Sequence, residues 1–397
     1  MQTKNAVVFG AGKIARGFIA HLLALSGYHI RFVEKSEPLV NLLRERRKYR
    51  VEVLGAPDKS TTIGDFDVLL SRDADAVADA VADAGVVFIS IGGPNLPEIV
   101  LLLSAGIGRA FARNRQEALN ILICENYFQP AELLRKLIEP ALTPDGRQWF
   151  RDRVGLIETM VLRSTIEPTE EMRAEDPLSL KTQDLWELPC DRQAFVGGIP
   201  PITGLSPQPN FQHALIRKLF TYNAINAVIV YPGYFKGYKL LSEAANDPVI
   251  IELVSEASRE AGAGLIKRYG FDPNDQRAFA ASALAKYQRP EIVDPIERNA
   301  RDPIRKLAPN DRLVGPARLA LEEGIRPKAL SSAIGAALHY DFPGDPAAVK
   351  LQAMIRNNGL GYALQTVCGI KEDSELGKLI AEAYSEVTEK LVTGEHA

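Results

Sequence analysis

Short apolar runs alternate with amphipathic stretches through the first part of the chain. Residues 5–10 read as a strand closed by glycine, and residues 12–25 carry apolar side chains at helical spacing, so the chain opens with a strand, a tight turn and a helix. Strands separated by helices predict a parallel sheet with helices on both faces, an α/β domain. Residues 49–73 are less regular and can hold extra strands at the sheet edge. Further strands are predicted at 29–34, 86–92, 119–126 and 154–162.

The pattern changes between residues 167 and 207. This stretch is rich in proline, glycine and acidic residues and lacks helical periodicity, which is typical of a connecting region. We place a domain boundary at residue 198, which gives a first domain over 1–198 and a second over 199–397. The second domain is predicted to be mainly α-helical because it carries long helical patterns. These include residues 255–270, 317–325 and 374–392.

The composition is that of a globular chain with two cores. A length of 397 residues exceeds one ordinary core, and 46% hydrophobic with 24% charged residues is near the globular average. A net charge of −3 gives no field that would attract nucleic acid or an anionic membrane surface. We therefore expect a small-molecule partner.

Three features of the sequence indicate the cellular compartment of the protein and whether it binds a metal. The first apolar run is too short for a signal sequence or a spanning helix. The three cysteines lack C-x-x-C spacing, and the five histidines lack H-x-x-x-H spacing. We therefore expect a cytoplasmic protein without disulfides or a bound metal.

The segment Gly10-Ala11-Gly12-Lys13-Ile14-Ala15 matches G-x-G-x-x-A between the first strand and the first helix. In that place Gly10 can supply the tight turn, Gly12 lets a pyrophosphate approach the backbone, and small Ala15 lets the helix pack on the strand. The free N–H groups of the helix N-terminus then face the phosphates. The context predicts a Rossmann-like dinucleotide site; the alternative is a glycine turn that only joins strand and helix. The cofactor-binding residues predicted in this turn are Gly10, Ala11, Gly12, Lys13 and Ile14.

Glu34 ends the second predicted strand and bears on the choice of cofactor. An acidic side chain there can accept hydrogen bonds from the ribose hydroxyls and would repel a 2′-phosphate, so NAD is favoured over NADP. The adjacent Lys35 can soften that rejection.

Lys218, Asn223 and Asn226 stand at positions i, i+5 and i+8 of a predicted helix. On an α-helix these positions lie within an arc of roughly 140°, so one face can present all three. A neutral lysine that takes a hydroxyl proton, together with amides that hold the oxygen, is a workable apparatus for alcohol oxidation. Taken alone, an exposed helix lysine is the commoner fate of such a residue.

Several long segments make the chain resemble the polyol-specific long-chain dehydrogenases, the mannitol dehydrogenase family. They run over nearly the whole chain: FGAGKIARGF (9–18), ICENY (123–127), RKLFTYN (217–223), GYFKGYKLLSEAANDP (233–248), LIKRYGFDP (265–273) and RDPIRKLAPNDRLVGPA (301–317). Within the family, the likeness and the total length point to the mannitol-1-phosphate 5-dehydrogenase branch. The resemblance implies an N-terminal cofactor domain and a helical substrate domain.

The family motif K-x4-N-x2-H implies that Lys218 is the general base and that Asn223 holds the substrate oxygen. The last position departs from the motif, because Asn226 stands where the family has histidine. An amide can donate a hydrogen bond but cannot pass a proton at neutral pH. Asn126, at the end of its predicted strand, resembles a family position beside the nicotinamide; a turn-capping role is the alternative.

A dense cationic set lies in the proline-containing segment from Arg298 to Arg312. Guanidinium groups bind phosphate well, so the set can anchor a sugar phosphate. Acidic residues interleaved with these cations can equally form a structural ion-pair network. The resemblance implies that Arg305 and Lys306 bind the substrate.

Together these features predict NAD-dependent interconversion of D-mannitol 1-phosphate and D-fructose 6-phosphate. Two alternatives stay open: a dehydrogenase of another polyol, polyol phosphate or sugar acid, with Asn226 reporting a different pocket, or an NAD-binding sensor that has lost catalysis. Between oligomeric states we favour a monomer.

Overall fold

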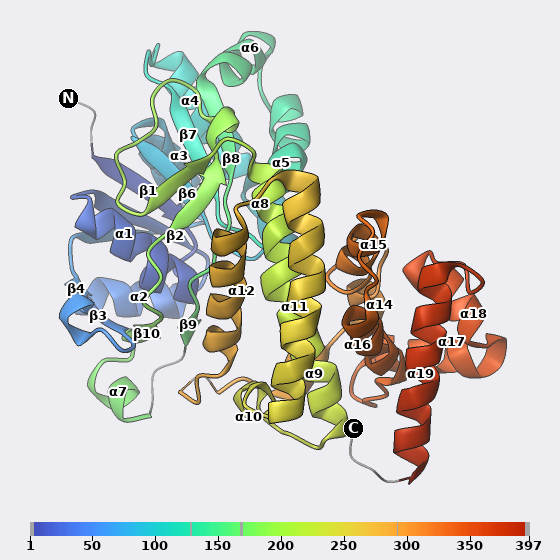
Figure 1. Cartoon of the computed structure of the whole chain (residues 1–397). Coiled ribbons are helices and arrows are strands. Elements are labelled where there is room, and N and C mark those ends of the chain that lie inside the picture. The colour runs from blue at the N-terminus through green and yellow to red at the C-terminus, as the bar shows by residue number, and fades with distance from the viewer. Residues whose placement is uncertain (1–3, 128, 167–169, 292, 394–397) are drawn as a thin grey trace. The chain divides into compact units, whose positions relative to one another are not determined.

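A computed structural model describes residues 4–127, 129–166, 170–291 and 293–393. The chain forms two compact units, Met1–Gln212 and His213–Ala397 (Figure 1). The sequence places the boundary at residue 198, whereas this division falls after Gln212. The difference arises because β12 (Leu205–Gln208) pairs in parallel with β11 (Leu188–Asp191), which keeps the later residues with the first unit.

The first unit is built on a six-stranded sheet in the order β5-β2-β1-β6-β7-β8. Every pairing in this sheet is parallel, and the order reverses between β1 and β6. This is the doubly wound order whose ligands bind at the carboxyl ends of the strands beside the reversal. The strands are β1 (Asn5–Phe9), β2 (His29–Glu34), β5 (Phe66–Leu70), β6 (Val86–Ile89), β7 (Leu119–Ile123) and β8 (Val154–Glu158).

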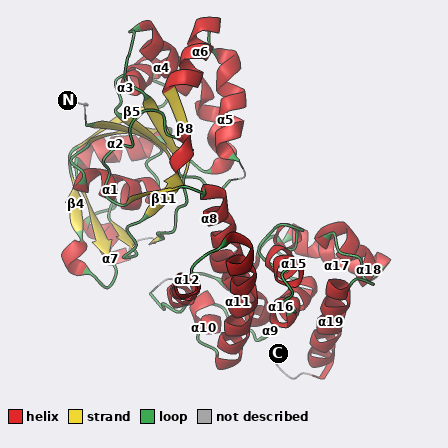
Figure 2. Cartoon of the chain, turned by 45° about the horizontal axis from the view of Figure 1, so that its top comes forward, coloured by secondary structure: helices red, strands yellow, loops and turns green. Residues whose placement is uncertain are grey.

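Within the six-stranded sheet, β1, β2, β5, β6 and β7 are each followed in the chain by helices that cover the sheet (Figure 2). Two apolar clusters, one on each face, form the core of the unit, as expected for a buried parallel sheet. The helix after β1 runs through a π-helical segment, Ala15–Ile19, into α1 (Ala20–Leu25). The others are α2 (Glu37–Arg46), α3 (Ala74–Ala82), α4 (Val100–Ala112), α5 (Pro130–Ile138) and α6 (Pro144–Arg153).

A second, four-stranded sheet has the order β4-β3-β10-β9. Two of its strands come from residues 49–73, whose sequence pattern is irregular, and β10 comes from the connecting region 167–207. Of the strands expected in residues 49–73, only β5 lies at the edge of the main sheet. The connecting region 167–207 is more structured than its composition suggests, since it supplies β10, β11, β12 and a short helix, α7 (Glu170–Glu175). The strands of the second sheet are β3 (Tyr49–Val53), β4 (Thr61–Ile63), β9 (Thr165–Ile166) and β10 (Leu180–Thr182).

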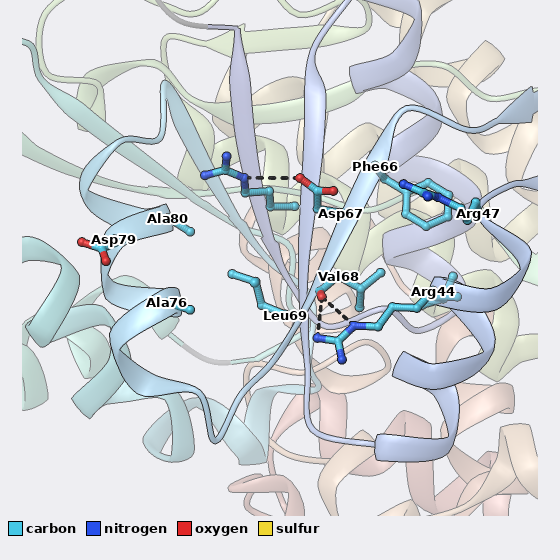
Figure 3. A pocket seen from close by; sticks show the side chains of 11 residues that line it. Arg44, Arg47, Phe66, Asp67, Val68, Leu69, Ala76, Asp79 and Ala80 are labelled. Atoms are coloured by element: carbon cyan, nitrogen blue, oxygen red, sulfur yellow. Dashed lines mark hydrogen bonds and ion pairs between the residues drawn. The ribbon is translucent and has the colours of Figure 1, made fainter.

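A groove of about 610 Å³ runs along the outer edge strand β5 between α2 and α3 (Figure 3). Arg44 Nε and Nη2 donate to Val68 O at 3.1 and 2.9 Å, so the guanidinium caps a carbonyl of the edge strand. Arg31 pairs with Asp67 at 3.8 Å. Covering an edge carbonyl with a charged side chain is a way to prevent pairing with another chain.

The second unit is helical, as predicted. Its largest apolar cluster surrounds α9 (Ala224–Phe235), which is buried over most of its length, and α11 (Pro248–Tyr269) packs against it. The remaining helices are α8 (Phe211–Lys218), α10 (Leu241–Ala245), α12 (Pro273–Tyr287), α13 (Ile296–Ala300), α14 (Pro303–Lys306), α15 (Val314–Glu322), α16 (Lys328–His339), α17 (Pro346–Asn358), α18 (Leu360–Ala363) and α19 (Glu375–Thr393).

One helical stretch among the described residues, Gly93–Ala112, is long and apolar enough to cross a membrane by length and composition alone. It contains α4, whose Leu103 and Ile107 are fully buried in the sheet core. A buried core helix passes the same test, so this stretch is explained by its packing in the first unit.

Candidate functional site

The glycine turn after β1 has the geometry that a dinucleotide site needs. Gly10 has φ +90°, and a Cβ there would overlap the carbonyl oxygen of Ser90 at the end of β6, so only glycine fits. A Cβ built on Gly12 meets nothing within 4 Å, which leaves open space over the backbone for a phosphate. Ala11 and Ala15 are fully buried beneath the turn. The turn therefore fits the expectation for Gly10, Gly12 and Ala15, and it fits a dinucleotide as ligand.

The helix after the turn carries a feature that the G-x-G-x-x-A pattern does not contain. A Cβ on Gly17 would lie 2.6 Å from Thr165 Cγ2, so this glycine allows the helix to approach the second sheet. The buried Arg16 donates from Nε to Ala11 O at 2.7 Å and braces the turn from below. The exposed Lys13 and half-buried Ile14 begin the helix, and the N-terminus of a helix is a favourable place for an anion.

Glu34 folds back onto the glycine turn. Its Oε2 accepts a hydrogen bond from Ala11 N at 2.8 Å, while Oε1 accepts from the backbone N–H of Lys35 and Ser36 at 2.8 and 2.9 Å. The side chain of Lys35 pairs with Glu98 at 2.9 Å. The carboxylate thus stands at the turn, where a ribose would lie.

Asn126 lies just beyond β7 at the carboxyl edge of the sheet, and its side chain is exposed. The residues on either side of it hold the loop after β6. Glu125 Oε1 accepts from Ile91 N at 2.6 Å and Gly92 N at 2.9 Å. The ring of Tyr127 packs so closely on Gly93 that a Cβ there would overlap it.

In the second unit, Lys218, Asn223 and Asn226 follow one another along a continuous helical run from α8 into α9. Between them lies a π-helical turn, Leu219–Asn223, in which Ala224 N bonds Leu219 O five residues back. Bonding from i to i+5 brings residues five apart toward the same face. Asn223 is therefore drawn toward the side of Lys218, closer than the 140° arc of a regular α-helix.

Helix α12 supports this π-turn from the side. Tyr287 Oη donates to Tyr222 O at 3.0 Å, which satisfies a carbonyl in the widened turn. The buried Gln276 donates from Nε2 to Thr221 Oγ1 at 3.0 Å and accepts from Arg217 Nε at 2.7 Å. The unusual turn is thus held by hydrogen bonds from a neighbouring helix.

The pKa of Lys218 is lowered from 10.5 to about 8. Burial is the main cause, and the positive charge of Arg312 adds to it. Both disfavour the ammonium form, so Lys218 is neutral in about a tenth of the molecules near pH 7. A lysine in this state can accept a proton from an alcohol.

Asn226 is only 8% exposed, and its Nδ2 donates to Asn299 Oδ1 at 3.1 Å. Asn299 in turn donates from Nδ2 to Pro295 O at 3.1 Å, and its backbone oxygen accepts from Lys306 Nζ. An amide at position 226 is thus satisfied by a second amide. Nothing in the sequence pattern marks Asn299, because its role appears only when α13 packs beside α9.

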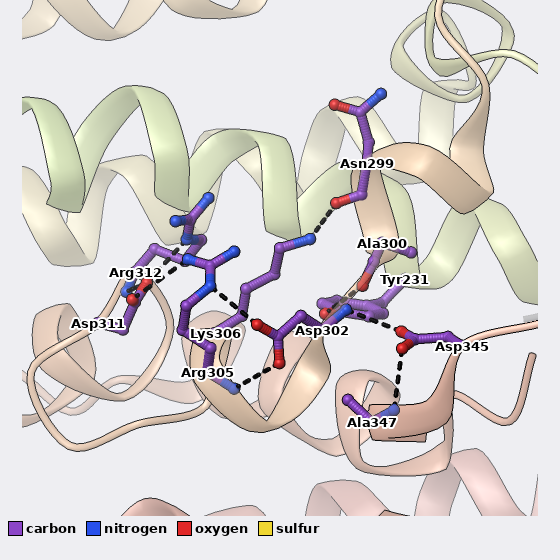
Figure 4. Close-up of polar contacts among 10 residues, drawn as sticks. All are labelled: Tyr231, Asn299, Ala300, Asp302, Arg305, Lys306, Asp311, Arg312, Asp345 and Ala347. Atoms are coloured by element: carbon purple, nitrogen blue, oxygen red, sulfur yellow. Dashed lines mark hydrogen bonds and ion pairs between the residues drawn. The ribbon is translucent and has the colours of Figure 1, made fainter. Parts of the chain in front are cut away.

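Lys306 and Arg312 lie in the cationic segment, the first buried and the second partly buried; Figure 4 shows their polar contacts. Lys306 is 3% exposed, and its pKa falls to about 7 because of burial and then the charges of Arg312 and Arg305. The side chain of Arg312 is 13% exposed, and its Nε donates to Asp311 at 2.8 Å. A buried lysine whose pKa is lowered by neighbouring cations is suited to receive an anion.

Arg305 differs from its neighbour Lys306. Its side chain is 52% exposed and pairs with Asp302 at 3.0 Å and Asp311 at 3.7 Å. Arg298 likewise pairs with Asp294 at 3.2 Å on the surface. These contacts are those of the ion-pair alternative, and Arg312 also pairs with Asp311, whereas the buried Lys306 donates to the backbone oxygen of Asn299.

Lys286 on α12 was not identified from the sequence. Its pKa is lowered to about 8 by burial and then by the charge of Lys218, so its ammonium lies within electrostatic reach of that residue. Its Nζ is 5.9 Å from the centre of the Tyr222 ring. The surrounding stretch has no motif and almost no amphipathic pattern, so no sequence signal distinguishes this lysine from a surface residue.

Comparison with known proteins gives a consistent picture over the whole chain. Residues 4–204 match the mannitol dehydrogenase Rossmann domain, and residues 212–388 match the mannitol dehydrogenase C-terminal domain. Mannitol-1-phosphate 5-dehydrogenase of Geobacillus thermodenitrificans is 36% identical and covers 96% of this chain and 99% of its own. The protein of that name from Bacillus subtilis is 35% identical and covers 96% of this chain and 100% of its own.

Solved structures share the fold at low identity. A D-sorbitol dehydrogenase in substrate-free form has a TM-score of 0.80 at 16% identity and covers 97% of this chain and 93% of its own. Mannitol 2-dehydrogenase of Pseudomonas fluorescens, in a ternary complex with NAD and D-mannitol, has a TM-score of 0.71 at 18% identity and covers 99% of this chain and 93% of its own.

Proposed function

We propose, because the chain belongs to the mannitol dehydrogenase family, that it interconverts D-mannitol 1-phosphate and D-fructose 6-phosphate with NAD. Two relatives, about a third identical to this chain over nearly their full length, are named mannitol-1-phosphate 5-dehydrogenase. The observation that carries the proposal is the lowered pKa of Lys218 beside Arg312 on the helix with Asn223. A neutral lysine among cations suits both alcohol oxidation and a phosphorylated substrate.

In the oxidative direction the residues of the second unit handle the proton. Lys218 Nζ accepts the proton of the secondary hydroxyl as the carbon–oxygen double bond forms, and it becomes an ammonium. Asn223 donates its amide hydrogen to the same oxygen and holds it during the change. NAD supplies the chemistry of hydride acceptance, so the carbinol hydrogen leaves with its electron pair and the products balance as ketone, NADH and one proton.

Asn226 has a different place in this mechanism from the family histidine. Its Nδ2 is engaged by Asn299 in the described structure, so we assign it the task of fixing Asn299 and, through it, Lys306. A substrate hydroxyl can still bond its carbonyl oxygen. Proton release from Lys218 then does not pass through position 226.

The phosphate is held by Lys306 and its cationic neighbours. Lys306 and Arg312 supply the main contacts, and Lys286 adds a further positive charge near Lys218. A dianionic phosphate would stabilise the ammonium groups of Lys306 and Lys286 and the guanidinium of Arg312, and it would relieve their mutual repulsion. Arg305 acts at the rim, because its side chain is 52% exposed and shares Asp311 with the less exposed Arg312.

The cofactor binds the first unit through the glycine turn, with Gly10, Ala11, Gly12, Lys13 and Ile14 at the pyrophosphate. Glu34 favours NAD because its carboxylate at the turn would repel a 2′-phosphate. Asn126, at the carboxyl edge of the sheet, would lie at the nicotinamide end of a bound cofactor. The three cysteines are free and buried, which suits a reducing compartment, and we place the enzyme in the cytoplasm.

A substrate panel tests the function. NADH formation is measured with mannitol 1-phosphate, mannitol, sorbitol 6-phosphate and a sugar acid, each with NAD and with NADP. Mannitol 1-phosphate with NAD should give the highest kcat/KM. A higher value for an unphosphorylated polyol or a sugar acid would overturn the substrate, and no turnover with any of them would overturn the enzyme.

The second candidate function is that of a dehydrogenase of another polyol phosphate. It is suggested by Asn226, which replaces the family histidine and so changes the shape of the substrate pocket. The Asn226–Asn299 pair favours this candidate over a sensor that has lost catalysis, because the replacement is integrated into a satisfied network. Asn226→His separates them: a working site loses activity, whereas a decayed site gains it.

A further inference from the structure

The loop between β6 and α4 forms one wall of the site at the strand reversal. β1 and β6 are the neighbouring strands between which the order reverses. Ser90 O lies directly against Gly10 of the dinucleotide turn, and Ser90 N donates to Phe9 O at 2.9 Å. Any movement of this loop therefore changes the wall against which a dinucleotide is bound.

Glu125 fastens the loop to the end of the next strand, β7. One carboxylate oxygen, Oε1, accepts the consecutive N–H groups of Ile91 and Gly92 at 2.6 and 2.9 Å. Gly92 has φ +88°, which turns the two amides toward one acceptor. Because Gly92 also caps the helical segment that begins at Gly93, the carboxylate stands at a helix N-terminus, where negative charge is favoured.

A second contact holds the loop from the other side of Asn126. The ring of Tyr127 packs directly on Gly93. Asn95 Nδ2 donates to Ile91 O at 2.6 Å and so adds a hydrogen bond within the loop. Asn126, between these two anchors, therefore has its backbone fixed relative to the loop on both sides.

We propose that Glu125 is a positioning residue, whose carboxylate locks the Ser90–Gly93 loop and so sets Asn126 and the glycine turn for NAD. This proposal rests on the proposed function for the identity of the cofactor. Glu125 acts through Asn126 and the loop, without contact with the substrate.

The ionisation of Glu125 offers a readout that a structural role alone would not move. Burial raises its pKa above the usual range, while the two N–H donors act in the opposite direction. The titratable neighbour Cys124 stays neutral, since burial raises the pKa of its thiol to about 12. A protonated carboxyl is a weaker acceptor, so the lock weakens as pH falls through the raised pKa.

The experiment compares Glu125→Ala, Glu125→Gln and Glu125→Asp with Glu158→Gln as a matched control. Glu158 is also a half-buried carboxylate at a strand end with a raised pKa, but it accepts from Ala131 N at 3.3 Å on a different loop. NADH affinity is measured by fluorescence without polyol, and the KM for NAD is measured at a series of pH values.

Glu125→Ala should weaken NADH binding and raise the KM for NAD by about tenfold, as expected for loss of charge-assisted hydrogen bonds. Glu125→Gln, whose amide oxygen still accepts both N–H groups, should keep affinity within about threefold at neutral pH and lose the decline on the acid side. Glu125→Asp is one methylene shorter and serves if the alanine variant does not fold.

The proposal is overturned if alanine and aspartate leave NADH affinity unchanged, or if Glu158→Gln produces the same loss. It is also overturned if Glu125→Gln keeps the acid decline of the parent. Because NADH binding needs no polyol, a failed substrate panel with a clear loss in Glu125→Ala would remove the proposed substrate and leave the lock standing.

Discussion

Replacing Lys218 with methionine should stabilise the protein while abolishing turnover. Burial and the charge of Arg312 lower the pKa of this lysine from 10.5 to about 8, so the charged side chain is less favourable in the fold than in the unfolded chain. Each pKa unit corresponds to about 1.4 kcal/mol, so a shift from 10.5 to about 8 gives at most ~3.5 kcal/mol. The side chain is only half-buried, and solvent screening reduces the expected gain to roughly 1–2 kcal/mol.

The gain has a definite pH dependence. Below pH 8 the lysine is charged in both the folded and the unfolded state, so the cost is complete. Between about 8 and 10.5 the folded lysine has lost its proton while the unfolded one keeps it, so the parent regains stability. The advantage of Lys218→Met is therefore largest near pH 6 to 7 and disappears above the unfolded pKa.

Urea denaturation followed by circular dichroism, repeated from pH 6 to pH 10.5, measures this. Lys236→Met is the control, because Lys236 is nearly buried but pairs with Asp247 at 3.1 Å, so its loss should destabilise at every pH in the range. The reasoning is refuted if Lys218→Met is destabilised like the control near pH 6, or if its advantage grows with pH.

Three further changes separate the parts of the site. Gly12→Ala should change the free energy of unfolding by less than about 1 kcal/mol, because its Cβ meets open space, yet it should lower NADH affinity about tenfold or more. Gly10→Ala, whose Cβ overlaps Ser90 O, should lower both the free energy of unfolding and NADH affinity. Binding titrations and melting curves measure the two quantities. Tyr287→Phe removes the hydroxyl that donates to Tyr222 O, so the free energy of unfolding should fall by about 1–2 kcal/mol and kcat should fall several-fold. An unchanged kcat would mean that the π-turn does not position Lys218 and Asn223. Lys306→Gln should raise the KM for mannitol 1-phosphate at least tenfold and leave the KM for NAD unchanged; equal effects on the two would contradict a phosphate contact.

The main sheet could be predicted from the sequence because each central strand is a continuous apolar run between turn residues. The ranges predicted for β1, β2, β6, β7 and β8 agree with the structure to within a few residues at the C-terminal ends. The second sheet could not, because its strands are two to five residues long and come from segments far apart in the chain, such as Val51 beside Leu180. Pairing across that separation leaves no local period to detect.

The glycine turn was recognisable as a local motif, and the lysine helix was recognisable only through the family resemblance, because spacing alone favours an exposed lysine. The π-turn, the pair Asn226–Asn299 and the position of Lys286 were not, since each depends on which helices pack together. Neighbouring residues in the sequence also diverge: Arg305 is exposed while Lys306 is buried, although both stand in the same cationic run. Side-chain burial of that kind is decided by the fold around a short helix such as α14.

The pH dependence of mannitol 1-phosphate oxidation tests the role of Lys218 most directly. With saturating NAD, log kcat/KM should rise with unit slope up to about pH 8 and then level off, as the ammonium gives way to the neutral base. In Lys218→Ala the rate should fall by a factor on the order of 10²–10⁴, and that rise should vanish. If Lys218→Ala keeps both the parent's rate and the inflection of log kcat/KM near pH 8, the assignment is contradicted.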